Sequence, residues 1–190
     1  MSFLKNGIVE NLETTRRIPI GRFWDVKLSI TPIAWLGPFI FFGLHFALNL
    51  LSPRLSLDER LTRSLYFVLA VELTMIIHAF GHILSGKLVY SAMDELLITT
   101  TRDVNIYEGD QGRIPSRLHV IRAVGGPALN ILIGIIFIFI SPLIPQGFWS
   151  NLNNSLVSTN LFFGLGGLLP IPSVDGEVIW REVIKGMKKQ

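Results

Sequence analysis

Apolar segments of membrane-spanning length alternate with polar connecting segments along this chain of 190 residues. Whole helical turns in these segments are apolar on every side, whereas a surface helix of a soluble protein needs only one apolar stripe. About 20 residues of helix cross a hydrocarbon layer of ~30 Å. The pattern therefore predicts a polytopic α-helical membrane protein with about four transmembrane helices, near residues 31–51, 65–85, 121–144 and 156–171.

Polar segments rich in β-branched and aromatic residues lie between these spans. Such segments are typical of strands when turn residues bound them. We expect strands near 18–30 and 87–107, with a turn at Pro19 to Gly21. Four spans put both segments on the same side of the membrane, which predicts a small β-sheet there. Nothing indicates a second unit, so residues 1–190 are interpreted as a single domain.

Basic residues are distributed unevenly between the two sides of the predicted spans. One side has only Arg54, Arg60 and Arg63. The other side, with both termini and the 87–120 loop, has Lys5, Arg16, Arg17, Arg22, Lys27, Lys87, Arg102, Arg113, Arg117, Arg122, Arg181, Lys185, Lys188 and Lys189. Because Lys and Arg are enriched in cytoplasmic loops, we expect the N- and C-termini and the sheet to be cytoplasmic. The small size and the lack of a targeting peptide favour a bacterial or archaeal inner membrane.

Composition narrows the chemistry that the chain can support. Hydrophobic residues make up 49% and charged residues 16%, below the roughly one quarter of charged residues in a globular domain. Cysteine is absent, so any metal must be held by His, Asp or Glu. The net charge of +3 lies in loops beside apolar segments. The expected partners are therefore the lipid bilayer and membrane proteins, not nucleic acid.

His78 and His82 are candidate metal ligands inside the second span. Residues four apart lie on one helix face, so two imidazoles at this spacing can converge on one ion. Ionisable groups within a membrane are functional candidates by default, although two hydrogen-bonded histidines inside a bundle would give the same pattern. Asp175 is the best third ligand, since it and both histidines fall toward the cytoplasmic ends of their spans. Three ligands leave a fourth position open, as in catalytic zinc sites; Asp175 followed by Gly176 could also be an ordinary turn.

Several separated motifs resemble the site-2 proteases, a family of intramembrane zinc metalloproteases. They are HAFGH at 78–82, where the family has HExxH, GGPALN at 125–130, LLPIPSVDG at 168–176, and the polar IPIGRFWDVKLSITP before the first span. The resemblance implies a helical membrane core with a small sheet and cleavage of substrate helices within the bilayer. It also implies Zn²⁺ held by His78, His82 and Asp175.

The sequence departs from the family at the residue that performs proton transfer. Ala79 stands where the family has the general-base glutamate, and a methyl group accepts no proton. Loss of a general base costs about two to four orders of magnitude in rate. Two smaller departures are Gly167, where the family usually has Asn, and Val174, where it has Leu.

Two other carboxylates are candidates to substitute for the missing glutamate. Glu72 is seven residues before Ala79 on nearly the same helix face, but about 10.5 Å away along the axis. A buried hydrogen-bonding role is therefore favoured for Glu72. Glu177 follows Asp175 by two residues. It could lean toward the metal or pair with Arg181 one turn later.

Residues near the predicted metal site are candidates for substrate binding. Gly125, Gly126 and Pro127 indicate a helix break, which at membrane depth must be buried or face a cavity. Asn130 could bind the backbone of a substrate or join neighbouring helices. Gly167 is included because it stands before the leucine-proline run.

These features lead to one function and two alternatives. The chain is interpreted as a site-2 protease-like zinc metallopeptidase that acts on transmembrane helices and is inactive as written because of Ala79. A non-catalytic pseudoprotease that binds membrane helices is the first alternative, and a metal-ion carrier is the second. Ala79 is either an engineered replacement or natural. Gly167 and Val174 favour the natural origin, since one engineered change leaves them unexplained.

Overall fold

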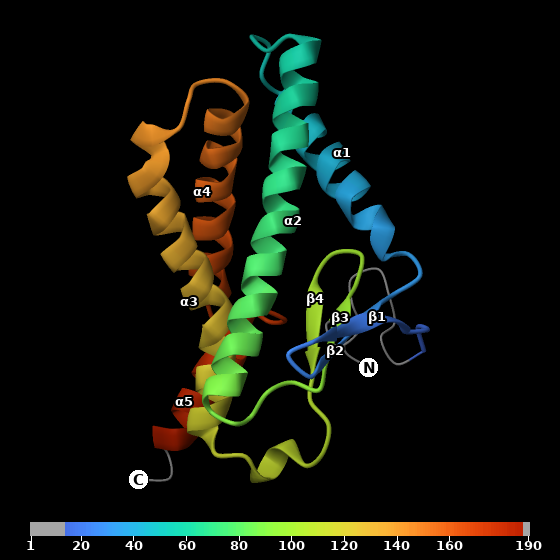
Figure 1. The fold of residues 1–190 in the computed structure, drawn as a ribbon, viewed down its shortest axis with the longest axis vertical. Coiled ribbons are helices and arrows are strands. Elements are labelled where there is room, and N and C mark those ends of the chain that lie inside the picture. Colours follow the sequence, from blue (N-terminus) through green and yellow to red (C-terminus); the bar gives the residue numbers. More distant parts are fainter. Residues whose placement is uncertain (1–13, 188–190) are drawn as a thin grey trace.

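The computed structural model describes residues 14–187. Helices run along the long axis, and a small sheet lies beside the lower part of the longest helix (Figure 1). In chain order the elements are β1 (Ile18–Phe23), β2 (Val26–Ile30), α1 (Gly37–Leu50), α2 (Leu57–Leu88), β3 (Glu95–Ile98), β4 (Asp103–Ile106), α3 (Ser116–Ile140), α4 (Phe148–Gly167) and α5 (Asp175–Met187), with 3-10 turns η1 (Ala34–Leu36), η2 (Gln111–Arg113) and η3 (Ser141–Leu143). Lys5, Lys188 and Lys189, which entered the orientation argument, lie outside the described residues.

The four strands form one mixed sheet in the order β1-β2-β3-β4. The outer pairs are antiparallel, and β2 runs parallel to β3. The turn expected at Pro19 to Gly21 is wrong, because those residues form part of β1 and interrupt only its register. The chain instead turns at Trp24 and Asp25, both of which adopt positive φ. One edge of the sheet is β4.

Two of the four expected spans have the length and hydropathy needed to cross a membrane. Leu57–Leu88 has a mean hydropathy of 1.9 over its best window, and Ser116–Leu143 reaches 2.3. The apolar helix Ala34–Leu50 is shorter; α1 itself has 14 residues, about 21 Å of helix. α4 has 20 residues and contains four asparagine and serine residues in its first turns, Ser150, Asn151, Asn153 and Asn154. Its polar half explains why it does not meet the same test.

α2 begins at a capping box. The Ser56 hydroxyl accepts from the Glu59 backbone N–H at 3.2 Å, and the Glu59 carboxylate accepts from the Ser56 N–H at 2.8 Å. This arrangement satisfies two amides that no helical carbonyl reaches. Asp58 and Glu59 also place negative charge at the positive end of the helix dipole. The start of the longest helix is therefore fixed locally.

Glycines allow α2 and α3 to pack backbone to backbone. A Cβ on Gly81 would meet the Gly125 carbonyl oxygen and lie 2.9 Å from the Gly126 Cα. Small residues permit such close approach between helices in a bilayer. α4 packs against the same helix at Gly164, where a Cβ would lie 2.6 Å from Ile131 Cγ1. α3 therefore lies close to both neighbours, with Gly125 and Gly126 beside the C-terminal part of α2.

Buried polar groups also join α2 to α4. The Thr74 and Thr159 hydroxyls are 2.8 Å apart, and Asn160 Nδ2 donates to Thr74 Oγ1 at 3.0 Å. All three residues are almost fully buried. Hydrogen bonds of this kind are worth about 0.6 kcal/mol or more inside a membrane bundle. They fix the register of the two helices one turn above His78.

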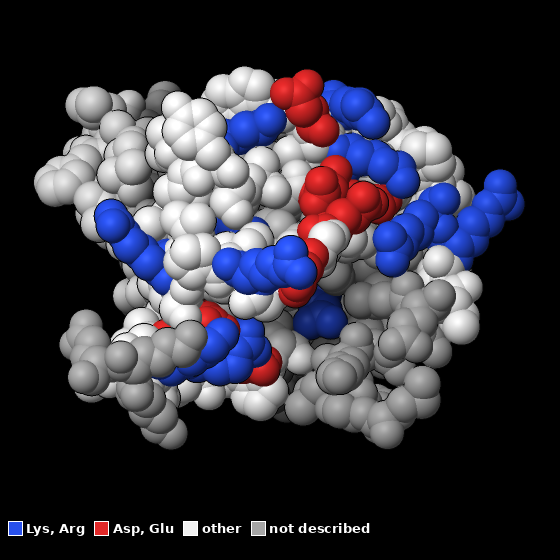
Figure 2. Space-filling view, turned by 90° about the horizontal axis from the view of Figure 1, so that it is seen from below, with Lys and Arg blue, Asp and Glu red and all other residues white. Residues whose placement is uncertain are grey.

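The sheet packs on the lower half of α2 through an apolar cluster. Ala79 and Ile83 of α2 contact Val26, Met93 and Leu96 in this cluster. The loop 89–115, α5 and the sheet all lie at the same end of the molecule (Figure 1). Figure 2 looks onto this end and shows Lys and Arg side chains around it, together with Asp and Glu. The sheet is thus held against the face of α2 that carries Ala79.

Candidate metal centre

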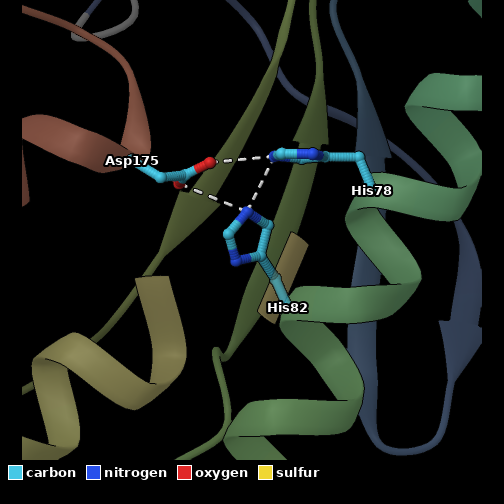
Figure 3. Close-up of side chains that lie close together, drawn as sticks. All are labelled: His78, His82 and Asp175. Carbon is cyan, nitrogen blue, oxygen red and sulfur yellow. Dashed lines mark hydrogen bonds and ion pairs between the residues drawn. The ribbon is translucent and has the colours of Figure 1, made fainter. Parts of the chain in front are cut away.

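His78, His82 and Asp175 converge at the lower end of the bundle. The two histidines are one turn apart on α2, and Asp175 is the first residue of α5, so the three side chains point toward one another (Figure 3). His78 Nε2 lies 2.9 Å from Asp175 Oδ2, and His82 Nε2 lies 3.2 Å from Asp175 Oδ1. The two Nε2 atoms are 3.0 Å apart. One small ion can be shared by ligand atoms at these separations.

The turn after α4 brings Asp175 to the histidines. Ser173 adopts φ 70°, which reverses the chain just before α5. Gly176 allows the turn to close, because a Cβ there would overlap the Leu169 carbonyl oxygen. Trp180 Nε1 donates to the Leu168 carbonyl at 3.0 Å and ties α5 back to the end of α4. The proline-containing segment thus places one carboxylate under two imidazoles.

The charge of Asp175 is set by burial and by its two neighbours. Burial alone would raise the pKa of this carboxyl, but His82 and then His78 outweigh burial and hold the pKa below its usual range. A carboxylate that stays ionised is a competent ligand for a divalent cation.

Hydrogen bonds on the far sides of the rings determine which nitrogen can bind a metal. His82 Nδ1 donates to the Arg122 carbonyl oxygen at 2.8 Å, which leaves the Nε2 lone pair free. The Asn130 amide lies 3.0 Å from His78 Nδ1, and Asn130 Oδ1 is buried without a hydrogen-bond partner among the described residues. Turning the amide brings this oxygen to the Nδ1 proton, an assignment made from the network. Both rings then present Nε2, as ligating histidines do.

The space facing the two Nε2 atoms is kept open by Gly126 of α3. A Cβ there would lie 2.5 Å from His82 Nε2 and 2.6 Å from His78 Nε2. His78, His82 and Asp175 each offer one ligand atom, and these atoms lie within 4.8 Å of one another. Two imidazoles and a carboxylate form a catalytic donor set for zinc. The residues therefore fit a zinc ion with one position left for water or substrate.

Comparison with solved structures identifies the architecture. The chain superposes on "Site-2 Protease from Methanocaldococcus jannaschii" with a TM-score of 0.62 and 17% identity, over 90% of this chain and 73% of that one. This chain has the fold of a site-2 protease. No protein-family model and no curated protein matches the sequence. The fold and the two apolar helices together indicate a membrane protein.

In this site-2 protease fold, Ala79 lines a cavity of about 850 Å³ beside the metal ligands. The same cavity is lined by all three candidate ligands, by the strand segment 101–105, and by Gly166 and Gly167 of α4. Ala79 is 5% exposed because its methyl group also packs on the sheet. The cavity thus lies between α2, β4 and the end of α4.

The two carboxylates predicted as substitutes for the glutamate, Glu72 and Glu177, differ in their position relative to this cavity. Glu72 lies two turns before Ala79 and is not among the described residues that line the cavity. Glu177 lines the cavity, but its Oε2 accepts from the Ser173 N–H at 2.8 Å and its Oε1 lies 3.6 Å from Arg181 Nη1. The structure therefore gives Glu177 a capping role at the start of α5.

The predicted substrate residues gather around the ligands. A Cβ on Gly167 would lie 3.0 Å from Pro127 Cγ and 3.8 Å from Asp175 Oδ2. Gly125 packs against α2, where a Cβ would overlap Ser85 Oγ. Asn130 is fully buried behind His78. Gly167 alone of these residues lines the cavity described above.

Two residues at the site were missed by the sequence interpretation. Arg122 fixes the tautomer of His82 through its backbone carbonyl, which no side-chain pattern signals. Asp103 begins β4 and lines the cavity. Burial, and next the charge of Glu72, raise the pKa of Asp103 to about 7. The available sequence signal was an acidic residue inside the segment 87–107 that is expected to form strands. Strongly perturbed carboxyls in a cleft are functional candidates.

Proposed function

We propose that this chain is a site-2 protease-like zinc metallopeptidase that acts on transmembrane helices. The convergence of His78, His82 and Asp175 within 4.8 Å carries the proposal. A bound zinc would lower the pKa of water and polarise the scissile carbonyl. The donor set, the open space at Gly126 and the fold all support this assignment.

The chain's own residues then have distinct tasks. His78, His82 and Asp175 hold the ion, while Asn130 and the Arg122 carbonyl orient the two rings. The cavity between α2 and β4 receives the substrate. Ala79 contributes no proton acceptor, so hydrolysis requires a carboxylate from another position.

We infer a membrane location with the metal site near the cytoplasmic face. The helices Leu57–Leu88 and Ser116–Leu143 supply the apolar length. The end that holds the ligands also carries most of the described basic residues, which supports a cytoplasmic placement in a bacterial or archaeal inner membrane. The substrate is then a single-span helix or another membrane protein.

A pseudoprotease that binds helices without cutting them is the second candidate. The observation in its favour is the buried methyl group of Ala79, which packs against Val26 and Met93 where a proton acceptor would be needed. Such a protein would keep the cavity and the ligands while holding substrates intact. The metal-ion carrier has no comparable support, since the described residues offer a single ligand cluster of three.

Cleavage of a panel of single-span substrates distinguishes these candidates. The unchanged chain, Ala79→Glu and the size-matched Ala79→Gln are each assayed with and without chelator. We expect Ala79→Glu to cleave and the chelator to stop it, because the added carboxylate stands beside the first histidine. Ala79→Gln should not exceed the unchanged chain. If zinc binds but none of the three forms cleaves, the binding protein is the better description.

A further inference from the structure

The cavity beside the metal ligands contains one carboxyl group that has no assigned task. Among residues 14–187, three acidic residues line this cavity, namely Asp103, Asp175 and Glu177. Asp175 faces both histidines, and Glu177 caps the start of α5. Asp103 remains.

The position of Asp103 is defined by the sheet and by α2. Asp103 is the first residue of β4, the edge strand, and pairs with Ile98 of β3. Its carboxyl is close enough to both Glu72 and His82 for electrostatic interaction. These two residues lie before and after Ala79 on the same helix, and Ala79 lines the same cavity. The carboxyl group therefore lies beside the stretch of α2 from which the family's glutamate would project.

One oxygen of the Asp103 carboxyl group, Oδ1, is buried and has no hydrogen-bond partner among the described residues. A buried polar atom without a partner costs free energy, and each such atom in a folded protein needs an explanation. Glu177, by contrast, is half exposed and already accepts from the Ser173 N–H. Of the cavity carboxyls outside the ligand set, Asp103 is the one free to accept a proton.

We propose that Asp103 is the general base of this site. From its position on β4 it performs the proton transfer that Ala79, on α2, cannot perform. The inference rests on the proposed peptidase function. Asp103 accepts a proton from the water that attacks the scissile carbonyl carbon, and the new C–O bond forms. The C–N bond then breaks, and the proton passes from Asp103 to the leaving amine nitrogen. One water is consumed and the carboxylate is regenerated.

The test uses the full-length protein loaded with zinc in detergent or liposomes. Asp103→Asn preserves size and removes the proton acceptor; Asp25→Asn, whose side chain is 91% exposed on the β1–β2 turn, is the matched control. Both changes are also made in the Ala79→Glu protein. Cleavage, zinc content and the amount of intact substrate helix that co-purifies are measured for each form.

We expect Asp103→Asn to slow cleavage by the otherwise unchanged chain by about 100-fold or more. Its zinc content should not change, and more intact substrate should co-purify. Asp25→Asn should cleave at the unchanged rate. In the Ala79→Glu protein, Asp103→Asn should have little effect, because the added glutamate supplies a second base.

Five results would overturn the proposal. Full cleavage by Asp103→Asn, or a loss seen only with Glu177→Gln, would assign the proton elsewhere. Loss of zinc in Asp103→Asn would make Asp103 a support for the ligands instead of a base. If Ala79→Glu cleaves but the unchanged chain does not, the peptidase function stands and this inference falls. If neither cleaves, both fall together.

Discussion

Gly126 is the residue on which access to the candidate metal site depends. Its missing side chain leaves open the space that the two imidazole nitrogens face, and any Cβ there would lie within 2.6 Å of both. Neither ring can withdraw freely, because Asn130 holds His78 and the Arg122 carbonyl holds His82. A single methyl group there would therefore occupy the space proposed for the ion.

This arrangement predicts that Gly126→Ala weakens zinc binding by about tenfold or more, the range seen when groups around a metal site are disturbed. Gly166→Ala is the control, since a Cβ there has no atom within 4 Å. Zinc content after dialysis against a graded chelator measures the effect. Equal zinc retention by the two variants would mean that the ion does not lie in front of Gly126.

At the residue scale, motif spacing indicated the candidate ligands, and the resemblance to the site-2 proteases marked Ala79 as the position of the general base. HAFGH and LLPIPSVDG identified residues that the structure brings together from α2 and α5. The partners of these ligands could not be predicted in the same way. The Arg122 interaction comes from a backbone carbonyl, and Asp103 lies 24 positions after Ala79 on a strand whose pairing is not local.

At the element scale, the sheet positions β4 so that its residues line the cavity. Its attachment includes Glu95 of β3, a buried carboxylate 3.3 Å from both Lys27 and Arg17. Burial opposes ionisation of Glu95, but Lys27, Arg17 and local hydrogen bonds outweigh burial and lower its pKa. The strand that precedes β4 is therefore stabilised by a charge pair that exists only while Glu95 is ionised.

A carboxyl with a lowered pKa stabilises the fold above the pKa of the unfolded chain and loses that contribution as pH falls through the folded pKa. We therefore expect stability to fall below about pH 4.5 in the unchanged protein and to depend less on pH in Glu95→Gln. At neutral pH, Glu95→Gln should cost about 1–2 kcal/mol. Thermal unfolding across this pH range measures both effects. Glu108→Gln, on the exposed loop after β4, is the control, and an equal loss in both variants would contradict the assignment.

Element boundaries were predicted less well than element types. Residues 18–30 do form two strands, but Pro19 and Gly21, residues that favour turns, are accommodated inside β1 as a register irregularity. The fourth expected span, 156–171, corresponds to a helix that starts at Phe148 and ends at Gly167. An apolar window cannot detect that the polar residues before 156 continue the same helix.

At the scale of the whole molecule, function requires the ligands and the sheet to lie at one end. The connection between α1 and α2 lies at the opposite end from the sheet and from the 107–115 loop (Figure 1). If the basic end is cytoplasmic, the two loops face opposite compartments.

Single-cysteine variants test this orientation, since the chain has no native cysteine to remove. In intact cells, a membrane-impermeant maleimide should label Ser52→Cys and should reach Glu108→Cys only after the cells are opened. Both positions are exposed in the fold, so burial does not account for a difference. The reverse pattern would invert the orientation, and equal labelling would argue against a spanning arrangement.

Arg122 connects the metal centre to the surface loop between β4 and α3. Its carbonyl accepts from His82, while its guanidinium lies 4.0 Å from the centre of the Tyr107 ring and donates to Gln111 and Ser91. If the candidate site binds zinc, any change in the hydrogen bond to His82 that accompanies binding acts on Arg122 and so on this loop, and such linkage is reciprocal. A molecule that binds the loop from the aqueous phase and raises the affinity for zinc would itself bind more tightly, by the same factor, when zinc is bound.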